Sequence, residues 1–110
     1  MNRQHGILIR SDRQVVADVY AAIWNGQEIR KKLLLHNDEI IFRDLRNDSI
    51  VVEASSNVGG PLITRGKDGF QLFGERFYGN ALIIADEDRL SPKISPEEIA
   101  HRIRFFRVGE

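Results

Sequence analysis

One segment near the end of the chain, Ala81-Leu82-Ile83-Ile84, restricts the fold more than any other. It is a continuous aliphatic run with no alternating polar residues. A run of this kind is typical of a central β-strand that is covered on both faces. It is also far shorter than the ~20 apolar residues that cross a bilayer as a helix, so we expect a soluble protein and no membrane segment.

Short strands separated by turn sequences are expected in the rest of the chain. The turn residues Arg46-Asn47-Asp48 separate two of these strands closely enough for antiparallel pairing. The loop-like segment Ser55 to Pro61 follows, and Arg65 to Gly69 is interpreted as a hairpin loop between Leu62-Ile63-Thr64 and Phe70 to Phe73. The other predicted strands are 5–10, 39–45 and 49–54, and residues 32–36 form a further short aliphatic run with β character.

A helix is expected after the first strand. Ser11 is suited to be its N-cap, and Gln14 completes a capping box. The apolar residues that follow have helical spacing, and Asn25-Gly26 is interpreted as its stop. Because the valines are β-branched and Asn-Gly is a hairpin dipeptide, a strand over 12–24 is the alternative. The apolar residues are Val15, Val16, Val19, Tyr20, Ile23 and Trp24.

A second helix is predicted near the C-terminus. Ser95 is suited to be the N-cap, Pro96 to be the first helical residue, and Glu98 to complete a capping box. Ile99, Ile103 and Phe106 would form its buried stripe, with Gly109 at its end. The prediction is a single α+β domain, 1–110. It has an antiparallel sheet of roughly five to six strands with an N-terminal and a C-terminal helix.

The composition narrows the class of protein. The chain has no cysteine, which excludes disulfides, thiolate zinc sites and a cysteine nucleophile and favours a cytoplasmic location. The formal net charge is zero, which argues against a binder of duplex nucleic acid. Basic and acidic residues are nevertheless grouped in blocks along the chain. Such patches suit a protein partner or self-association, and also an ordinary solvated surface.

The polar residues do not form a recognisable catalytic or metal-binding motif. His5, His36 and His101 lack the spacing of metal ligands, and no serine stands in a nucleophile-elbow sequence. Ser11 and Ser95 are interpreted as helix caps. The sequence therefore predicts no catalytic residue, no metal and no cofactor, and it favours a non-enzymatic role without excluding an enzyme.

Basic and aromatic residues alternate between residues 65 and 78. Arg65, Lys67, Arg76 and Tyr78 are the candidate ligand-binding residues, with the three cations facing an anion. Single-stranded nucleic acid binders combine such groups, because rings stack on bases while cations follow the backbone. The other interpretation is that alternate aromatics, Phe70 and Phe77 among them, face the core while the charges face water.

Two segments carry a resemblance. Gly6 to Asp12 and Phe77 to Asp86 resemble a family of small uncharacterised proteins found in phages and bacteria. Its members open with a short aliphatic strand and have a Gly-Asn-Ala-aliphatic strand near the end. The resemblance implies a mobile-element or accessory context and a regulatory or inhibitory binding role. The family has no agreed activity, so it assigns no functional residue.

The functional prediction from the sequence is a non-enzymatic protein-interaction module with an unknown protein partner or a second copy as a homodimer. Blocky charge and strand-rich sequence support it, since an exposed sheet edge invites pairing with another chain. The alternative is a small-ligand or nucleotide-binding protein whose pocket is lined by the loop Ser55 to Pro61 and the segment Arg65 to Tyr78.

Overall fold

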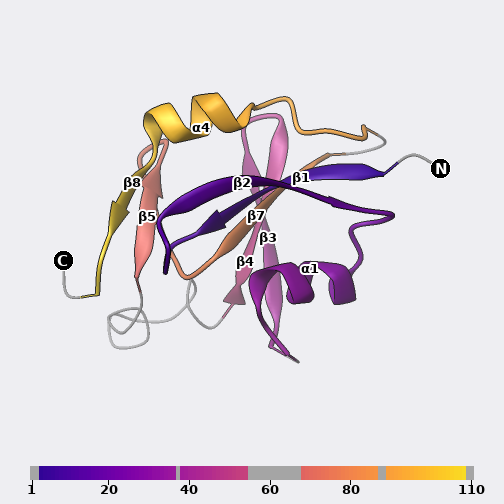
Figure 1. Ribbon diagram of the computed structural model, residues 1–110, viewed down its shortest axis with the longest axis horizontal. Coiled ribbons are helices and arrows are strands. Elements are labelled where there is room, and N and C mark those ends of the chain that lie inside the picture. Colours follow the sequence, from indigo (N-terminus) through magenta and orange to yellow (C-terminus); the bar gives the residue numbers. More distant parts are fainter. Residues whose placement is uncertain (1–2, 37, 55–67, 87–88, 109–110) are drawn as a thin grey trace.

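The computed structural model describes residues 3–36, 38–54, 68–86 and 89–108. Over these ranges it contains two helices and eight strands (Figure 1). In chain order they are β1 (Gln4–Arg10), β2 (Val15–Ala21), α1 (Gly26–Leu33), β3 (Ile40–Leu45), β4 (Asp48–Glu53), β5 (Gly69–Leu72), β6 (Glu75–Tyr78), β7 (Ala81–Ala85), α4 (Pro96–Arg102) and β8 (Arg104–Phe106).

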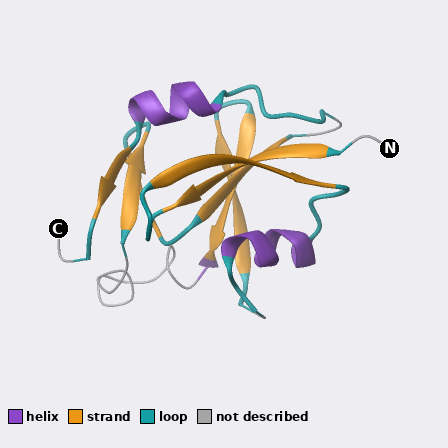
Figure 2. Cartoon of the chain, in the orientation of Figure 1, coloured by secondary structure: helices purple, strands orange, loops and turns teal. Residues whose placement is uncertain are grey.

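The strands form two antiparallel sheets. The large sheet has five strands in the order β2-β1-β7-β4-β3, and the small sheet has three in the order β6-β5-β8. Helix α1 lies against one face of the large sheet, while α4 and the small sheet lie on the other side (Figures 1 and 2). The α+β class with an antiparallel sheet is therefore confirmed, and three strands are separated into a second sheet.

Strand β7 is the middle strand of the large sheet, as its aliphatic sequence predicts. Its side chains alternate between two hydrophobic cores, because successive residues of a strand point to opposite faces. Ile83 lies in the core shared with the small sheet and α4, and Leu82 lies in the core beneath α1; both are fully buried.

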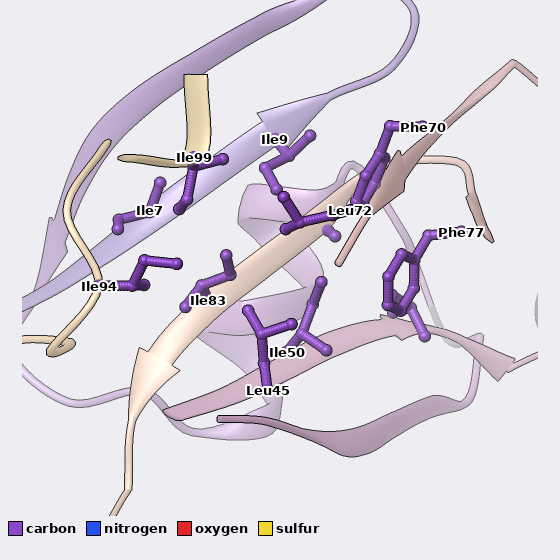
Figure 3. Packing of buried hydrophobic residues seen from close by; sticks show 12 residues of the cluster. Ile7, Ile9, Leu45, Ile50, Phe70, Leu72, Phe77, Ile83, Ile94 and Ile99 are labelled. Atoms are coloured by element: carbon purple, nitrogen blue, oxygen red, sulfur yellow. The ribbon is translucent and has the colours of Figure 1, made fainter. Parts of the chain in front are cut away.

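The core between the two sheets holds the large buried side chains (Figure 3). The rings of Phe70 and Phe77 stack there with centroids 5.1 Å apart. Ile99 of α4 packs into the same core. Burying a side chain of this size contributes roughly 1.5–3 kcal/mol, so this core ties the small sheet and α4 to the large sheet. The buried residues labelled in the figure are Ile7, Ile9, Leu45, Ile50, Phe70, Leu72, Phe77, Ile83, Ile94 and Ile99.

The predicted strands at 5–10, 39–45 and 49–54 are confirmed as β1, β3 and β4, within a residue at each end. The last two form the expected hairpin, with Leu45 opposite Asp48 at its turn. Phe70 to Leu72 lies in β5, where a strand is predicted. The loop expected at residues 55–61, the strand at 62–64 and most of the hairpin loop at 65–69 fall outside the described residues.

The helix predicted from Ser11 to Trp24 is wrong, and the strand alternative is correct. Residues Val15–Ala21 form β2, which pairs with β1 along its whole length. Ser11 is not a cap but a buried turn residue, and Gln14 has a left-handed backbone with φ 55° in the same turn. The β-branched valines favour a strand, and pairing with β1 satisfies their backbone groups.

Helix α1 begins at Asn25-Gly26, the dipeptide that the sequence pattern predicts to end a helix. Asn25 is the N-cap of α1, because its side-chain oxygen accepts a hydrogen bond of 2.9 Å from the backbone N–H of Glu28. The helix ends at Leu34, whose backbone is left-handed with φ 63°. The β character expected over residues 32–36 is therefore also wrong. Basic residues fill the last turn, where they complement the negative end of the helix dipole.

The second helix begins as predicted and ends early. Ser95 caps α4, with its hydroxyl accepting from the N–H of Glu98 at 3.1 Å, and Pro96 opens the helix. Ile103 already has an extended backbone, and Phe106 lies in β8 instead of on a helical stripe. Pairing of β8 with β5 satisfies backbone groups that a longer helix would have satisfied internally. Neither helix in the described ranges has the length and apolar character required to cross a membrane.

Candidate functional site

Strand β2 forms one edge of the large sheet. Of the described strands it pairs only with β1. Opposed residues of an antiparallel pair project to the same face, so Val16, Asp18 and Tyr20 share the face of Ile9, Ile7 and His5. Val15 is 44% exposed and Tyr20 is 47% exposed. This edge therefore presents apolar and aromatic groups next to a row of backbone N–H and C=O groups.

The opposite edge, β3, has a different chemistry. It carries the adjacent charges Arg43 and Asp44, in contrast to the single charge of β2. The guanidinium of Arg43 lies 2.7 Å from a carboxylate oxygen of Glu75 and 5.1 Å from the centroid of the Phe77 ring. Charged side chains on an edge strand discourage pairing with another chain. The two edges are thus unequal, and β2 is the less protected one.

His5 on β1 joins three distant parts of the chain. Its Nδ1 lies 2.6 Å from the hydroxyl oxygen of Ser91, and its Nε2 is hydrogen-bonded to the carboxylate of Asp18. The ring of Tyr20 stacks on the imidazole with centroids 5.1 Å apart. The backbone N–H of His5 also donates to the carbonyl of Leu90 at 2.7 Å. The imidazole is held from both nitrogens and one ring face.

Sequence reasoning missed this constellation. It treated His5 as one of three unrelated histidines and did not single out Asp18 or Ser91. Asp18 and His5 come together through the β1–β2 register, and Ser91 reaches them only through the segment after β7. A strand assignment for β2 would have placed Asp18 diagonally across from His5, but no local signal indicates Ser91.

A small hollow of about 230 Å³ lies beside His5. Its walls include the guanidinium-bearing residue Arg89, whose Nη1 is buried and has no hydrogen-bond partner among the described residues. Its Nη2 contacts Asp48 and the carbonyl of Asn47. A buried polar atom without a partner is rare and costly in proteins. The lining residues are Gln4, His5, Ile23, Trp24, Ile84, Ala85, Arg89 and Leu90.

The predicted ligand-binding residues are only partly described. Arg65 and Lys67 fall outside the described residues, whereas Arg76 and Tyr78 both lie on β6. The guanidinium carbon of Arg76 is 4.1 Å from the ring centroid of Phe106 and 5.8 Å from that of Tyr78. The two rings meet edge to face at 5.5 Å. Arginine and aromatic groups therefore form one stack on the outer face of the small sheet.

The aromatic residues divide between the two faces of the small sheet. Phe70 and Phe77 point into the core, as the core interpretation of these rings predicts. Tyr78 and Phe106 both stand opposite Gly69, on the outer face. Arg76 and Arg104 both stand opposite Gln71, which puts them in the neighbouring row of that face. Phe106 was not recognised as part of this surface because a helix was expected there.

The remaining polar candidates have structural partners. The N–H of Ser11 donates to the side-chain oxygen of Asn80 at 3.0 Å, and its hydroxyl donates to the carbonyl of Gly79. These bonds connect the β1–β2 turn to the β6–β7 turn. Among the described residues there is no group of three or more histidine and carboxylate side chains suited to hold a metal ion.

Comparison of the chain with protein-family models, with curated proteins and with solved structures gave no significant match. The resemblance to small phage and bacterial proteins therefore stays a prediction.

Proposed function

We propose that this protein is an interaction module that self-associates by pairing β2 with the β2 strand of a second copy. The observation that supports this proposal is the edge itself: seven residues with a single charge and no proline, glycine or lysine. Edge strands in soluble proteins are normally protected by such residues or by bulges. An edge without them is a template for strand addition.

The one charged residue on this edge has a partner within the chain. The carboxylate of Asp18 is hydrogen-bonded to the imidazole of His5 on the face of the sheet. Val15, Tyr20 and the following Ile23 add exposed apolar surface, with Ile23 57% exposed. Burial of apolar surface at about 25 cal/mol per Å² would supplement the hydrogen bonds between the two edges.

The sequence of β2 is compatible with antiparallel pairing to itself. Opposed residues must project to the same face, so the two-fold axis has to pass through a residue pair such as Ala17–Ala17, Asp18–Asp18 or Val19–Val19. A register centred on Asp18 would oppose two carboxylates, which is unfavourable. Registers centred on Ala17 or Val19 oppose only apolar residues at the centre. Both of these registers are therefore acceptable.

The oligomeric state tests the proposal. Native mass spectrometry and sedimentation of the full chain over a concentration series should show a dimer. Ala17→Lys, which places a charge on the exposed edge, should give a monomer with unchanged circular dichroism. Phe42→Lys on the opposite edge is the matched control and should leave the dimer intact. A wild-type chain that is monomeric throughout the series, or a dimer that survives Ala17→Lys, contradicts the proposal.

A second candidate function is the binding of a small anionic aromatic ligand, such as a nucleotide, on the outer face of the small sheet. The observation that favours it is the stack of Arg76 with Phe106 and Tyr78, next to Arg104. Rings and guanidinium groups accept bases by stacking, and guanidinium groups bind phosphate. The two rows of this face carry no carboxylate among the described residues.

Thermal denaturation against a panel of nucleotides tests this candidate. A ligand present at a hundred times its dissociation constant stabilises the folded state by about 2.7 kcal/mol, which is readily measured. The shift should disappear in Arg76→Gln and persist in Arg102→Gln, whose guanidinium lies over Phe73 instead. Absence of a shift across the panel would remove this candidate.

A further inference from the structure

We propose that Ser91 is a nucleophile for acyl transfer, with His5 as its general base and Asp18 as a positioning residue. This goes beyond self-association, because it assigns a covalent chemistry to the chain. Its basis is one continuous set of contacts from the hydroxyl of Ser91 through the imidazole of His5 to the carboxylate of Asp18. Nucleophile, base and orienting group within hydrogen-bond reach are the geometric signature of such a site.

In the neutral imidazole, the contact with Asp18 assigns the ring proton to Nε2. A carboxylate only accepts hydrogen bonds, so Asp18 requires the proton of the neutral ring to be on Nε2. Nδ1 is then unprotonated and faces the Ser91 hydroxyl at 2.6 Å, ready to accept its proton. The best-known serine hydrolases present Nε2 to the serine and Nδ1 to the aspartate. The roles are exchanged here, and either ring nitrogen has the basicity that the step requires.

The imidazole is also held in place. Tyr20 stacks on one face of the ring, and the side chain of His5 is only 17% exposed. The backbone hydrogen bond from His5 to Leu90 fixes the residue next to Ser91. A base that is already oriented needs no rearrangement at the moment of proton transfer. Side chains stand perpendicular to a sheet, so His5, Asp18 and Tyr20 project from its face and not from its edge. Pairing of β2 with a second copy along the edge therefore leaves this site in place.

The hollow beside His5 is lined by Leu90, the residue before Ser91, and its size suits a small substrate. Its volume of about 230 Å³ lies below the ~300–1,000 Å³ usual for drug-sized ligands. Ile23, Trp24 and Leu90 supply apolar walls, which suit a short acyl or aryl group.

The reaction balances without any cofactor. The Ser91 oxygen attacks the carbonyl carbon of an ester while its proton passes to Nδ1 of His5. The ester C–O bond breaks, and the leaving alcohol takes that proton, which leaves an acyl group on Ser91. Water then attacks the acyl group while His5 accepts one of its protons; the bond from the acyl carbon to the Ser91 oxygen breaks, and that oxygen takes the proton back from His5 as the acid leaves. The expected substrate class is the small carboxylic ester.

The test uses an aryl fluorophosphonate and p-nitrophenyl acetate with the full chain. Fluorophosphonates phosphonylate activated serines with loss of fluoride, and the absence of cysteine removes competing thiols. Intact-mass measurement should show one adduct, peptide mapping should place it on Ser91, and the ester should turn over. No adduct on Ser91 after prolonged exposure, or an adduct spread over several serines, overturns the proposal.

Variants separate chemistry from a purely structural role. His5→Gln, which keeps a hydrogen-bonding side chain, should lower the labelling rate about 100-fold or more, the usual range for loss of a general base. Asp18→Asn should lower the maximal labelling rate about tenfold or more and leave the probe concentration for half-maximal rate unchanged, as expected for a positioning residue. Ser49→Ala is the matched control. Its hydroxyl donates to the carboxylate of Asp86, and it should label like wild type. Equal labelling of wild type and His5→Gln contradicts the assigned roles.

Discussion

The carboxylate of Asp48 lies 3.1 Å from the guanidinium of Arg89, and the aspartate side chain is only 1% exposed. The same carboxylate accepts hydrogen bonds from the backbone N–H groups of Lys93 and Ile94, at 2.9 and 3.0 Å. A residue at the start of β4 thereby holds the segment that leads from β7 to α4. This segment also contains Ser91 and Leu90, so Asp48 fixes the position of the groups that contact His5.

Asp48→Asn should destabilise the fold by about 2–4 kcal/mol, because a buried charge partner and one of two charge-assisted hydrogen bonds are lost. The free energy of unfolding in urea measures this. Asp44→Asn, on exposed β3, is the control and should change it by less than about 0.5 kcal/mol. An equal effect of the two substitutions would show that the buried carboxylate has no special role.

Gly69 should not tolerate a side chain. A Cβ atom at this position would lie 2.1 Å from the backbone oxygen of Phe77 and 2.6 Å from Cζ of Phe106. Backbone of β6 and the ring that covers the glycine would both have to move. Gly69→Ala should therefore cost about 3 kcal/mol, at the upper end for overpacking, and should weaken pairing of the small sheet. The urea midpoint and the amide exchange rates of β5 measure these effects.

Gly74→Ala provides the comparison for this substitution. No atom lies within 4 Å of a Cβ placed at Gly74, but its φ is +80°. The cost there is only that of a left-handed backbone, about 1–2 kcal/mol. A larger loss for Gly74→Ala than for Gly69→Ala would contradict the steric account.

Acid should weaken the β1–β2 turn through Asp12. A hydrogen bond from Arg10 lowers the pKa of the Asp12 carboxyl below its ordinary value of 3.8. A carboxyl whose pKa is lower in the folded state contributes stability above its unfolded pKa and loses it as the pH falls through the folded value. NMR titration of the Asp12 carboxyl should show a midpoint below 3.8, and Arg10→Gln should raise that midpoint. A midpoint that Arg10→Gln leaves unchanged would contradict this cause.

Introduced cysteines should report the register of the dimer. The wild-type chain has none, so a single cysteine gives an unambiguous cross-link. Opposed Cβ atoms of a non-hydrogen-bonded pair lie ~4.5 Å apart, within reach of a disulfide. Oxidation of Ala17→Cys or Val19→Cys should give a covalent dimer on a non-reducing gel for one of the two. Phe42→Cys should stay monomeric, and efficient cross-linking at Phe42 alone would move the interface to the other edge.

The fold could be predicted from sequence where local chemistry and burial agree. The aliphatic run of β7 predicts a strand in the interior of a sheet. The pair Ser95-Pro96 predicts the N-cap and first residue of α4. The prediction failed for β2, because apolar residues there also match helical spacing. The deciding factor is the pairing of β2 with β1, a non-local contact that spacing does not encode.

The candidate sites were harder to predict for the same reason. Arg76 and Tyr78 were recognised because they are close in sequence, whereas their neighbour Phe106 comes from β8. His5 and Ser91 are separated by most of the chain and meet only after β7 has joined the sheet. Side-chain chemistry assembled by topology leaves no spacing pattern for a sequence to display.

The central place of β7 has a consequence for the order in which the molecule folds. The β1–β2 and β3–β4 hairpins have no hydrogen-bonded strand contact with each other, and β7 inserts between them. A growing chain can therefore form both hairpins early, but each keeps an unsatisfied inner edge until residue 85 has emerged. Closing the sheet requires long-range contacts with a high entropic cost, so we expect this late insertion to limit the folding rate. The nascent protein would be most prone to aggregation in the interval before it.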